Sequence, residues 1–163
     1  MTSVLRIILL FVFALFWGGL TFYTGFVVRI SHDVLYDPMD GGLITQRVTA
    51  LLQIFGAVAA AFMLLNAIVV GRSSNRFGIV LAMAAIVLGV SIVGLFVVHS
   101  QLDAVIDVSA AEITDRERFT QLHRHYNQLT TVQWIASVAY LPITVIAWNK
   151  IDRNPHACVD DQS

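Results

Sequence analysis

Eight polar side chains border or interrupt the apolar stretches of this chain, and their types and spacing could build a binding site. They are Arg29, His32, Asp33, Gln53, His99, Asp103, His123 and Asn127. Arg29 with Asp33, His99 with Asp103 and His123 with Asn127 are each four residues apart, which puts both members on one helix face. The chemistry that such a set offers is ion pairing, anion binding or metal coordination.

Metal coordination is the most specific of these alternatives. Helical bundles build metal and haem sites from imidazole and carboxylate groups on facing helices, so the candidate ligands are His32, His99, His123 and Asp103. The sequence contains no HExxH motif, no Glu-x-x-His pair and only a single cysteine, Cys158. We therefore expect no cofactor, and we keep a metal or haem protein using the three histidines as the alternative.

Four long apolar runs must position these residues. They cover residues 7–28, 48–71, 77–99 and 131–148. About 20 helical residues cross a hydrocarbon core of about 30 Å. With 57% hydrophobic residues and a mean hydropathy of +0.74, the chain is too apolar for a soluble fold. We predict an all-α, four-helix antiparallel transmembrane bundle over residues 1–150, followed by a polar tail, 151–163.

The helix boundaries follow from local signals. We expect helices over residues 3–36, 43–71, 77–107 and 115–149, with a turn at Asp40-Gly41-Gly42 and a bend at Pro142. Thr114 and Glu117 have the spacing of a capping box. This layout places loops 37–42 and 108–115 at one end of the bundle, where the helices protrude. Both termini and the short loop 72–76 lie at the other end.

The eight polar residues then meet at the protruding end. Polar groups at membrane depth are costly unless they pair or line a wet cavity, so we predict a polar, partly hydrated pocket there. Arg29 has an alternative, which is to extend its charged end to the membrane interface. No nucleophile–base pair, P-loop or dinucleotide motif occurs, which favours a non-enzymatic binding protein or an accessory subunit of a membrane complex.

Small residues recur along the third apolar run. Gly78, Ala82, Ala85 and Gly89 share one helix face, where they let two backbones approach closely. We expect this face to pack within the bundle, with a homodimer contact as the alternative. Gly89 in particular should lie where two backbones nearly touch.

The orientation of the bundle depends on Lys and Arg. Each end carries five of them, but Arg72 and Arg76 concentrate in one short loop. We therefore place both termini in the cytoplasm and the protein in a plasma or inner membrane, with the pocket on the extracytoplasmic side. The net charge of −1 gives no footprint for nucleic acid. The expected partners are the lipid bilayer and either a second copy or a membrane-complex subunit.

Two segments resemble a known family. Residues 16–22 (FWGGLTF) with 25–28 (GFVV), and residues 119–123 (FTQLH) with Asn127, are similar to the transmembrane protein 205-like family. That resemblance implies a four-helix membrane domain without an assigned reaction, and it carries over only His123 and Asn127. The segment from Arg29 to Asp33 and the compact 37–42 loop depart from the family's pattern.

Overall fold

The computed structural model describes residues 3–36, 38–107 and 112–153. Its elements are α1 (Ser3–Phe22), the π-helix η1 (Tyr23–Val27), α2 (Val28–Val34), α3 (Pro38–Gly71), α4 (Asn75–Asp103), β1 (Ile106–Asp107), β2 (Glu112–Ile113) and α5 (Arg116–Arg153). The strands are two residues each and form a small antiparallel ladder. The predicted all-α, four-helix architecture is confirmed.

Four helical segments are long and apolar enough to cross a membrane. They are Ser3–Ser31, Asp40–Gly71, Asn75–Asp103 and Arg116–Arg153. The chain is therefore a multi-pass membrane protein. With 38 residues, α5 is about 57 Å long and exceeds the hydrocarbon thickness by a wide margin. It continues through Pro142 and ends four residues beyond the predicted boundary at Asn149.

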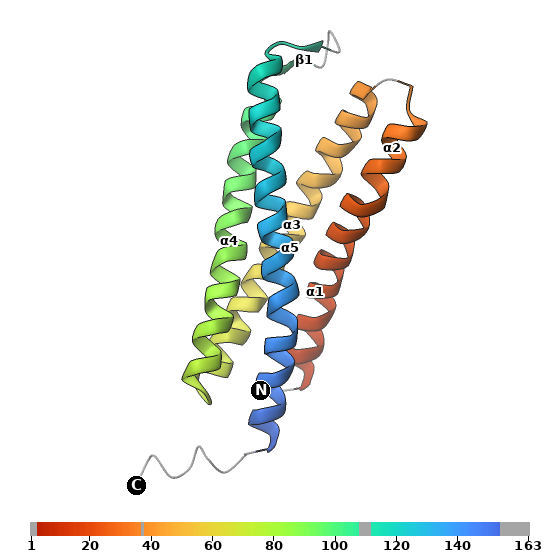
Figure 1. The fold of residues 1–163 in the computed structure, drawn as a ribbon. Helices are drawn as coiled ribbons and strands as arrows, with labels where there is room; N and C mark the ends of the chain where they lie inside the picture. Colours follow the sequence, from red (N-terminus) through yellow and green to blue (C-terminus); the bar gives the residue numbers. More distant parts are fainter. Residues whose placement is uncertain (1–2, 37, 108–111, 154–163) are drawn as a thin grey trace.

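Figure 1 shows the arrangement of the helices, with α1–α2 and α4 running opposite to α3 and α5. The short α3–α4 connection lies at the same end as the first and last described helical residues, and the other two connections lie at the opposite end. The predicted layout of two antiparallel hairpins is thus confirmed. The most extensive packing joins α4 to α3 and to α5, whereas α1 packs mainly on α3.

The first helix differs from the prediction in its middle. A π-helical turn, Tyr23–Val27, interrupts it, and the helix ends at Val34 because Leu35 is extended. A π turn contains one residue more than an α turn, so it rotates the residues that follow relative to those before. Tyr23 is buried, whereas the next three residues are exposed.

The second helix begins earlier than predicted. Residues Asp40, Gly41 and Gly42 are helical, so the turn assigned to them is wrong and α3 starts at Pro38. Proline suits the first helical position because its missing N–H is not needed there, and Asp40 is favourable in a first turn. Gly41 is buried next to Leu35, and its carbonyl accepts the Thr45 hydroxyl at 2.8 Å.

The connection between α4 and α5 also corrects the prediction. Helix α4 ends at Asp103 rather than at residue 107, and β1 and β2 follow. The Thr114 hydroxyl donates to the Val105 carbonyl at 3.0 Å, so the predicted capping box is wrong. Asp115 performs the capping: its Oδ1 accepts the backbone N–H of Arg118 at 3.0 Å. The predicted start of the helix near Asp115 is confirmed.

The close helix contact lies at Gly78 and not at Gly89. A Cβ on Gly78 would overlap the Gly71 Cα and lie 2.9 Å from the Gly71 nitrogen, so these backbones nearly touch across the α3–α4 hairpin. A Cβ on Gly89 would meet nothing within 4 Å among the described atoms, so the expectation for Gly89 was wrong. Gly56 makes the equivalent close approach to the Phe16 ring.

Candidate functional site

Seven of the eight candidate side chains are described, and these seven do not form one cluster. On α4, His99 Nε2 lies 3.9 Å from Asp103 Oδ2, which is a weak i,i+4 contact. Asp103 Oδ1 also accepts a hydrogen bond of 2.5 Å from Gln46 Nε2 on α3. Asp103 therefore connects α4 to α3, through a glutamine that was not among the eight.

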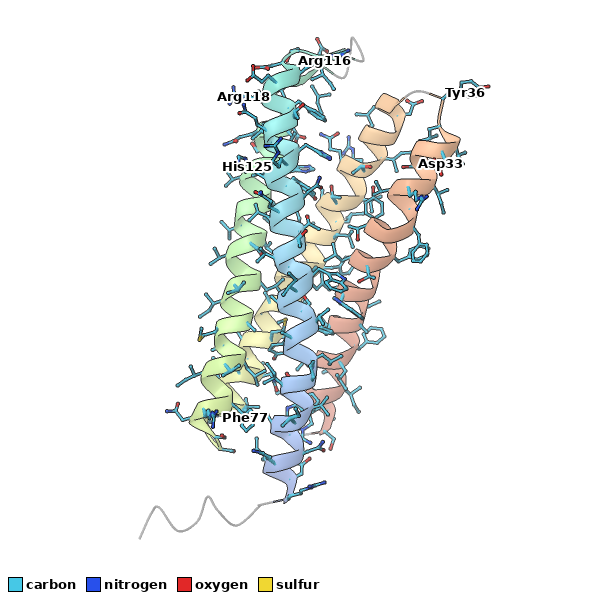
Figure 2. All side chains as sticks on the ribbon, viewed as in Figure 1. Asp33, Tyr36, Phe77, Arg116, Arg118 and His125 are labelled. Atoms are coloured by element: carbon cyan, nitrogen blue, oxygen red, sulfur yellow. The ribbon has the colours of Figure 1, made fainter. Side chains whose placement is uncertain are left out.

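Arg29 and Asp33 of α2 take no part in this connection between described side chains. Arg29 and Asp33 are both exposed, and no hydrogen bond or ion pair joins either to another described side chain. Figure 2 shows Asp33 on α2 and His125 on α5 near the same end, on separate helices. The side chain of His32 is outside the described part of the structure.

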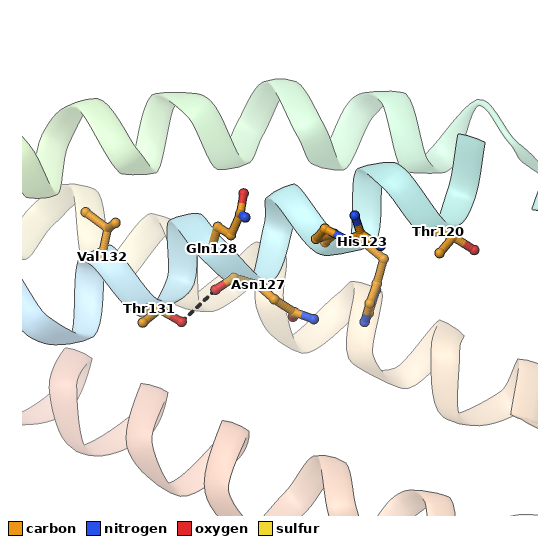
Figure 3. A pocket seen from close by; sticks show the side chains of 7 residues that line it. Thr120, His123, Asn127, Gln128, Thr131 and Val132 are labelled. Carbon is orange, nitrogen blue, oxygen red and sulfur yellow. Dashed lines mark hydrogen bonds between the residues drawn. The ribbon is translucent and has the colours of Figure 1, made fainter. Parts of the chain in front are cut away.

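His123 and Asn127 lie on the outward face of α5. They line an open groove of about 620 Å³ together with five other residues of the same helix: Thr120, Arg124, Gln128, Thr131 and Val132. All seven are exposed, and the helical period places them opposite the buried Leu122 and Gln133. Figure 3 shows six of them, labelled, along the α5 ribbon. The His123 ring stacks on Phe119 at 5.8 Å between centroids.

The described side chains do not form a set of ligands for the metal or haem that the sequence offers as an alternative. Among the described residues, no three His, Cys, Asp or Glu side chains lie close enough to hold an ion. Of the four candidate ligands, the structure brings together only His99 and Asp103. Binding of a metal or haem by His32, His99 and His123 therefore stays a prediction.

Among the seven candidates whose side chains are described, Gln53 is the one that lies fully inside the bundle. Its side chain is 4% exposed. Neither its amide nitrogen nor its amide oxygen makes a hydrogen bond of good geometry in the described part of the chain, although the Tyr126 hydroxyl of α5 lies close to it and to Thr49. We call these three neighbouring side chains, Thr49, Gln53 and Tyr126, the Gln53 pocket.

The other hydroxyl in this pocket is already occupied. Thr49 is 8% exposed and donates to the Thr45 carbonyl one turn earlier, at 2.7 Å. Tyr23 continues the polar surface towards α1, because it lies next to Thr45 and faces Tyr126. Apart from the nearby Tyr126 hydroxyl, Gln53 thus keeps its amide donors and its acceptor oxygen for another partner.

A second buried polar group lies nearer the end of the bundle where the termini are, and it was not predicted from the sequence. Asn66 Nδ2 donates to the Tyr140 hydroxyl at 2.8 Å, and that hydroxyl donates to the Met63 carbonyl at 2.9 Å. Trp148 Nε1 donates to Asn66 Oδ1 at 3.0 Å. The three side chains are 1%, 1% and 7% exposed, so this network is buried. An isolated asparagine within an apolar run was the signal that could have revealed it.

Near the ends of the chain, a charged contact joins α1 to α5. The Arg6 guanidinium makes two hydrogen bonds to the Asp152 carboxylate, of 2.5 and 2.7 Å, and lies 5.1 Å from the centre of the Trp148 ring. This bidentate pair borders the buried Asn66 network on the side of the termini.

The interior polar groups are uncharged, and the charged groups are at the surface and helix ends. The Gln53 pocket consists of an amide and hydroxyls, which suit an uncharged hydrogen-bonding molecule. The outward groove of α5 adds an imidazole and a guanidinium, which suit a polar or anionic group. Comparison of the chain with family models, with curated proteins and with solved structures found no match.

Proposed function

We propose that this protein is a non-enzymatic, multi-pass membrane protein that binds a small polar molecule in the Gln53 pocket. The observation that carries the proposal is the buried and unpartnered amide of Gln53, within the residues described. Leaving a buried amide without a partner costs about 1–3 kcal/mol, so such groups are usually satisfied by water or by a ligand. A ligand at Gln53 would recover this energy.

The pocket favours an uncharged ligand with both a donor and an acceptor. Arg29 and Asp33 are exposed, so neither brings a buried charge to Gln53. The amide of Gln53 can donate and accept at the same time, and the Tyr126 hydroxyl can do the same. Small amides and polyols have this combination of groups.

Cysteine accessibility tests the pocket. In a Cys158→Ser background, Gln53→Cys should react readily with N-ethylmaleimide, a small uncharged reagent, in the full chain in lipid nanodiscs. Ala59→Cys is the matched control, since Ala59 is on the same helix and 0% exposed. We expect the cysteine at residue 53 to react much faster than the one at 59. Equal, slow reaction at both positions in folded protein would reject the pocket.

The outward groove of α5 favours a second candidate function, as an accessory subunit of a membrane complex. Polar side chains such as Asn127, Gln128 and Thr131 are exposed on this helix although the helix crosses the membrane. Polar groups facing lipid are costly, so a second copy or a partner helix that covers them would be stabilised. Cross-linking from Asn127→Cys in native membranes would detect such a neighbour.

The orientation of the bundle belongs to the same proposal. We place both termini in the cytoplasm of a cell with this protein in its plasma or inner membrane, so that the Gln53 pocket is near the extracytoplasmic side. The support is the short connection between α3 and α4, which carries Arg72 and Arg76.

The resemblance to the transmembrane protein 205-like family remains a proposal as well. The two positions that it carries over, His123 and Asn127, lie one turn apart and line the same groove. If the relationship holds, this groove is the surface that the family's late motif forms.

A further inference from the structure

The inner face of α5 is polar over a long distance, although it is buried. Gln133, Ser137 and Thr144 are 2%, 0% and 0% exposed. They lie four and seven residues apart, which puts them on one helix face at intervals of about 6 and 10 Å. We call these three residues the α5 seam.

Each residue of the seam has a polar atom without a partner. Gln133 Nε2 and Ser137 Oγ make no hydrogen bond to any described residue, and Thr144 Oγ1, which lies beside the Tyr140 hydroxyl, makes none of good geometry. Within an apolar bundle, such atoms are destabilising unless another molecule binds them. Three of them on one buried helix face are therefore a coherent feature and not an isolated defect.

The two seam hydroxyls also differ from several other hydroxyls in the bundle, such as those of Ser91 and Thr131. Serine and threonine within helices commonly donate to a carbonyl three or four residues earlier. Ser91 donates to Leu88 in this way at 2.8 Å, and Thr131 donates to Asn127 at 2.8 Å. Ser137 and Thr144 make no such bond within the described chain, so both hydroxyls are left to bond another molecule.

We propose that the α5 seam binds water molecules inside the bundle. Water is the smallest molecule that can both donate and accept, and buried waters typically bond two to four otherwise unsatisfied polar groups. The seam offers an amide donor at Gln133 and hydroxyls, which both donate and accept, at Ser137 and Thr144. Bound waters satisfy all three.

At its Thr144 end, the seam meets side chains whose polar groups are already hydrogen-bonded. Thr144 lies beside Tyr140, whose hydroxyl is already bonded to Asn66 and to the Met63 carbonyl. The Trp148 indole is paired with Asn66 as well. The bound water therefore ends at a fully paired group, which separates it from the end of the bundle where the termini lie. This inference does not depend on what occupies the Gln53 pocket.

Radiolytic hydroxyl-radical labelling of the full chain in nanodiscs tests the seam. Ionising radiation converts bound water to radicals in place, so a buried side chain next to water becomes oxidised. Tyr140 is 1% exposed and lies one turn from both Ser137 and Thr144, whereas Phe16 is 1% exposed in the apolar core. We expect rapid oxidation of Tyr140 and little of Phe16. Equal protection of both rings would overturn the proposal.

Substitutions test whether the oxidation of Tyr140 depends on the polar groups of the seam. Ser137→Ala combined with Thr144→Val should remove most of the Tyr140 oxidation, whereas Ser91→Ala should leave it unchanged, since the Ser91 hydroxyl is already bonded. Gln53→Leu should leave it unchanged too, which separates this site from the Gln53 pocket. If the double variant does not fold, the unfolding midpoint of Ser137→Ala alone tests whether the Ser137 hydroxyl binds water. Loss of a hydroxyl that binds water lowers that midpoint, and loss of a dry, unpaired hydroxyl raises it.

Discussion

Asn66 shows how a polar side chain can stabilise the interior of a membrane bundle. Its amide nitrogen donates to Tyr140 and its amide oxygen accepts from Trp148, so both ends are used. The Tyr140 hydroxyl in turn donates to the backbone carbonyl of Met63 on α3. Since a buried polar group is costly only when it is unpaired, this network joins α3 to α5 without a penalty.

Removal of the Tyr140 hydroxyl should therefore destabilise the bundle, because it leaves buried polar groups unpaired. Tyr140→Phe keeps the ring but leaves the Asn66 amide and the Met63 carbonyl without this partner. We expect a loss of about 1–3 kcal/mol in the free energy of unfolding. Ser91→Ala is the control, because its hydroxyl bonds only a carbonyl of its own helix, and we expect a much smaller loss. Denaturant unfolding in detergent, followed by tryptophan emission, measures both. Equal losses would contradict the network's role.

At the scale of elements, the α3–α4 hairpin is held by its glycines. The backbones approach so closely at Gly71 and Gly78 that no side chain fits between them. The connecting residues complete the turn, because the N–H groups of Ser73 and Ser74 both donate to the Val70 carbonyl. The direction of α4 relative to α3 is thus fixed at the shortest loop of the chain.

Alanine substitutions at two glycines of α4 test this contact. Gly78→Ala should destabilise the bundle by about 1–3 kcal/mol, because its Cβ would collide with the Gly71 backbone. Gly89→Ala should be neutral or stabilising by up to about 1 kcal/mol, because its Cβ meets nothing within 4 Å and alanine favours a helix. Thermal unfolding of the two variants in the same detergent provides the comparison. A lower midpoint for Gly89→Ala than for Gly78→Ala would reverse the assignment.

The sequence predicted the elements well and the side-chain neighbours poorly. Length and hydropathy are local properties, so four apolar runs are enough to predict four helices and two hairpins. Which face of a helix is buried depends on its partners. For this reason the sequence alone could not show which of Gly78 and Gly89 lies at the close backbone contact. The spacing of His123 and Asn127 predicted that they face the bundle interior, but both lie on the exposed face of α5. The π turn at Tyr23–Val27 was not predicted either, because these residues give no composition signal for it.

At the scale of the whole molecule, the bundle separates its polar groups by position. Uncharged groups are inside, at Gln53 and along the α5 seam, whereas charged groups lie at the two ends. From Tyr126 to Trp148 the inner face of α5 extends for about 33 Å, close to the thickness of a hydrocarbon core. The part of α5 before Tyr126 is therefore available to extend beyond the membrane.

Labelling in intact cells tests the proposed orientation. In a Cys158→Ser background, Ser74→Cys places a thiol in the short α3–α4 connection, and Gln121→Cys places one near the start of α5. We expect a membrane-impermeant maleimide to label residue 121 from outside and to label residue 74 only after the cells are opened, because clustered arginines resist translocation. The opposite pattern would invert the bundle.

The bond between Arg6 and Asp152 has a consequence for biosynthesis. Asp152 follows Arg6 by 146 positions, so it leaves the ribosome much later than Arg6 does. The α3–α4 hairpin can form while translation is still under way, because its two helices are neighbours in the chain. Helix α1 packs mainly on α3, but its charged anchor on α5 does not exist until α5 has been synthesised. The contact between Arg6 and Asp152 thus forms only after the other three spans have been made, and a chain truncated before residue 152 would insert its helices without it.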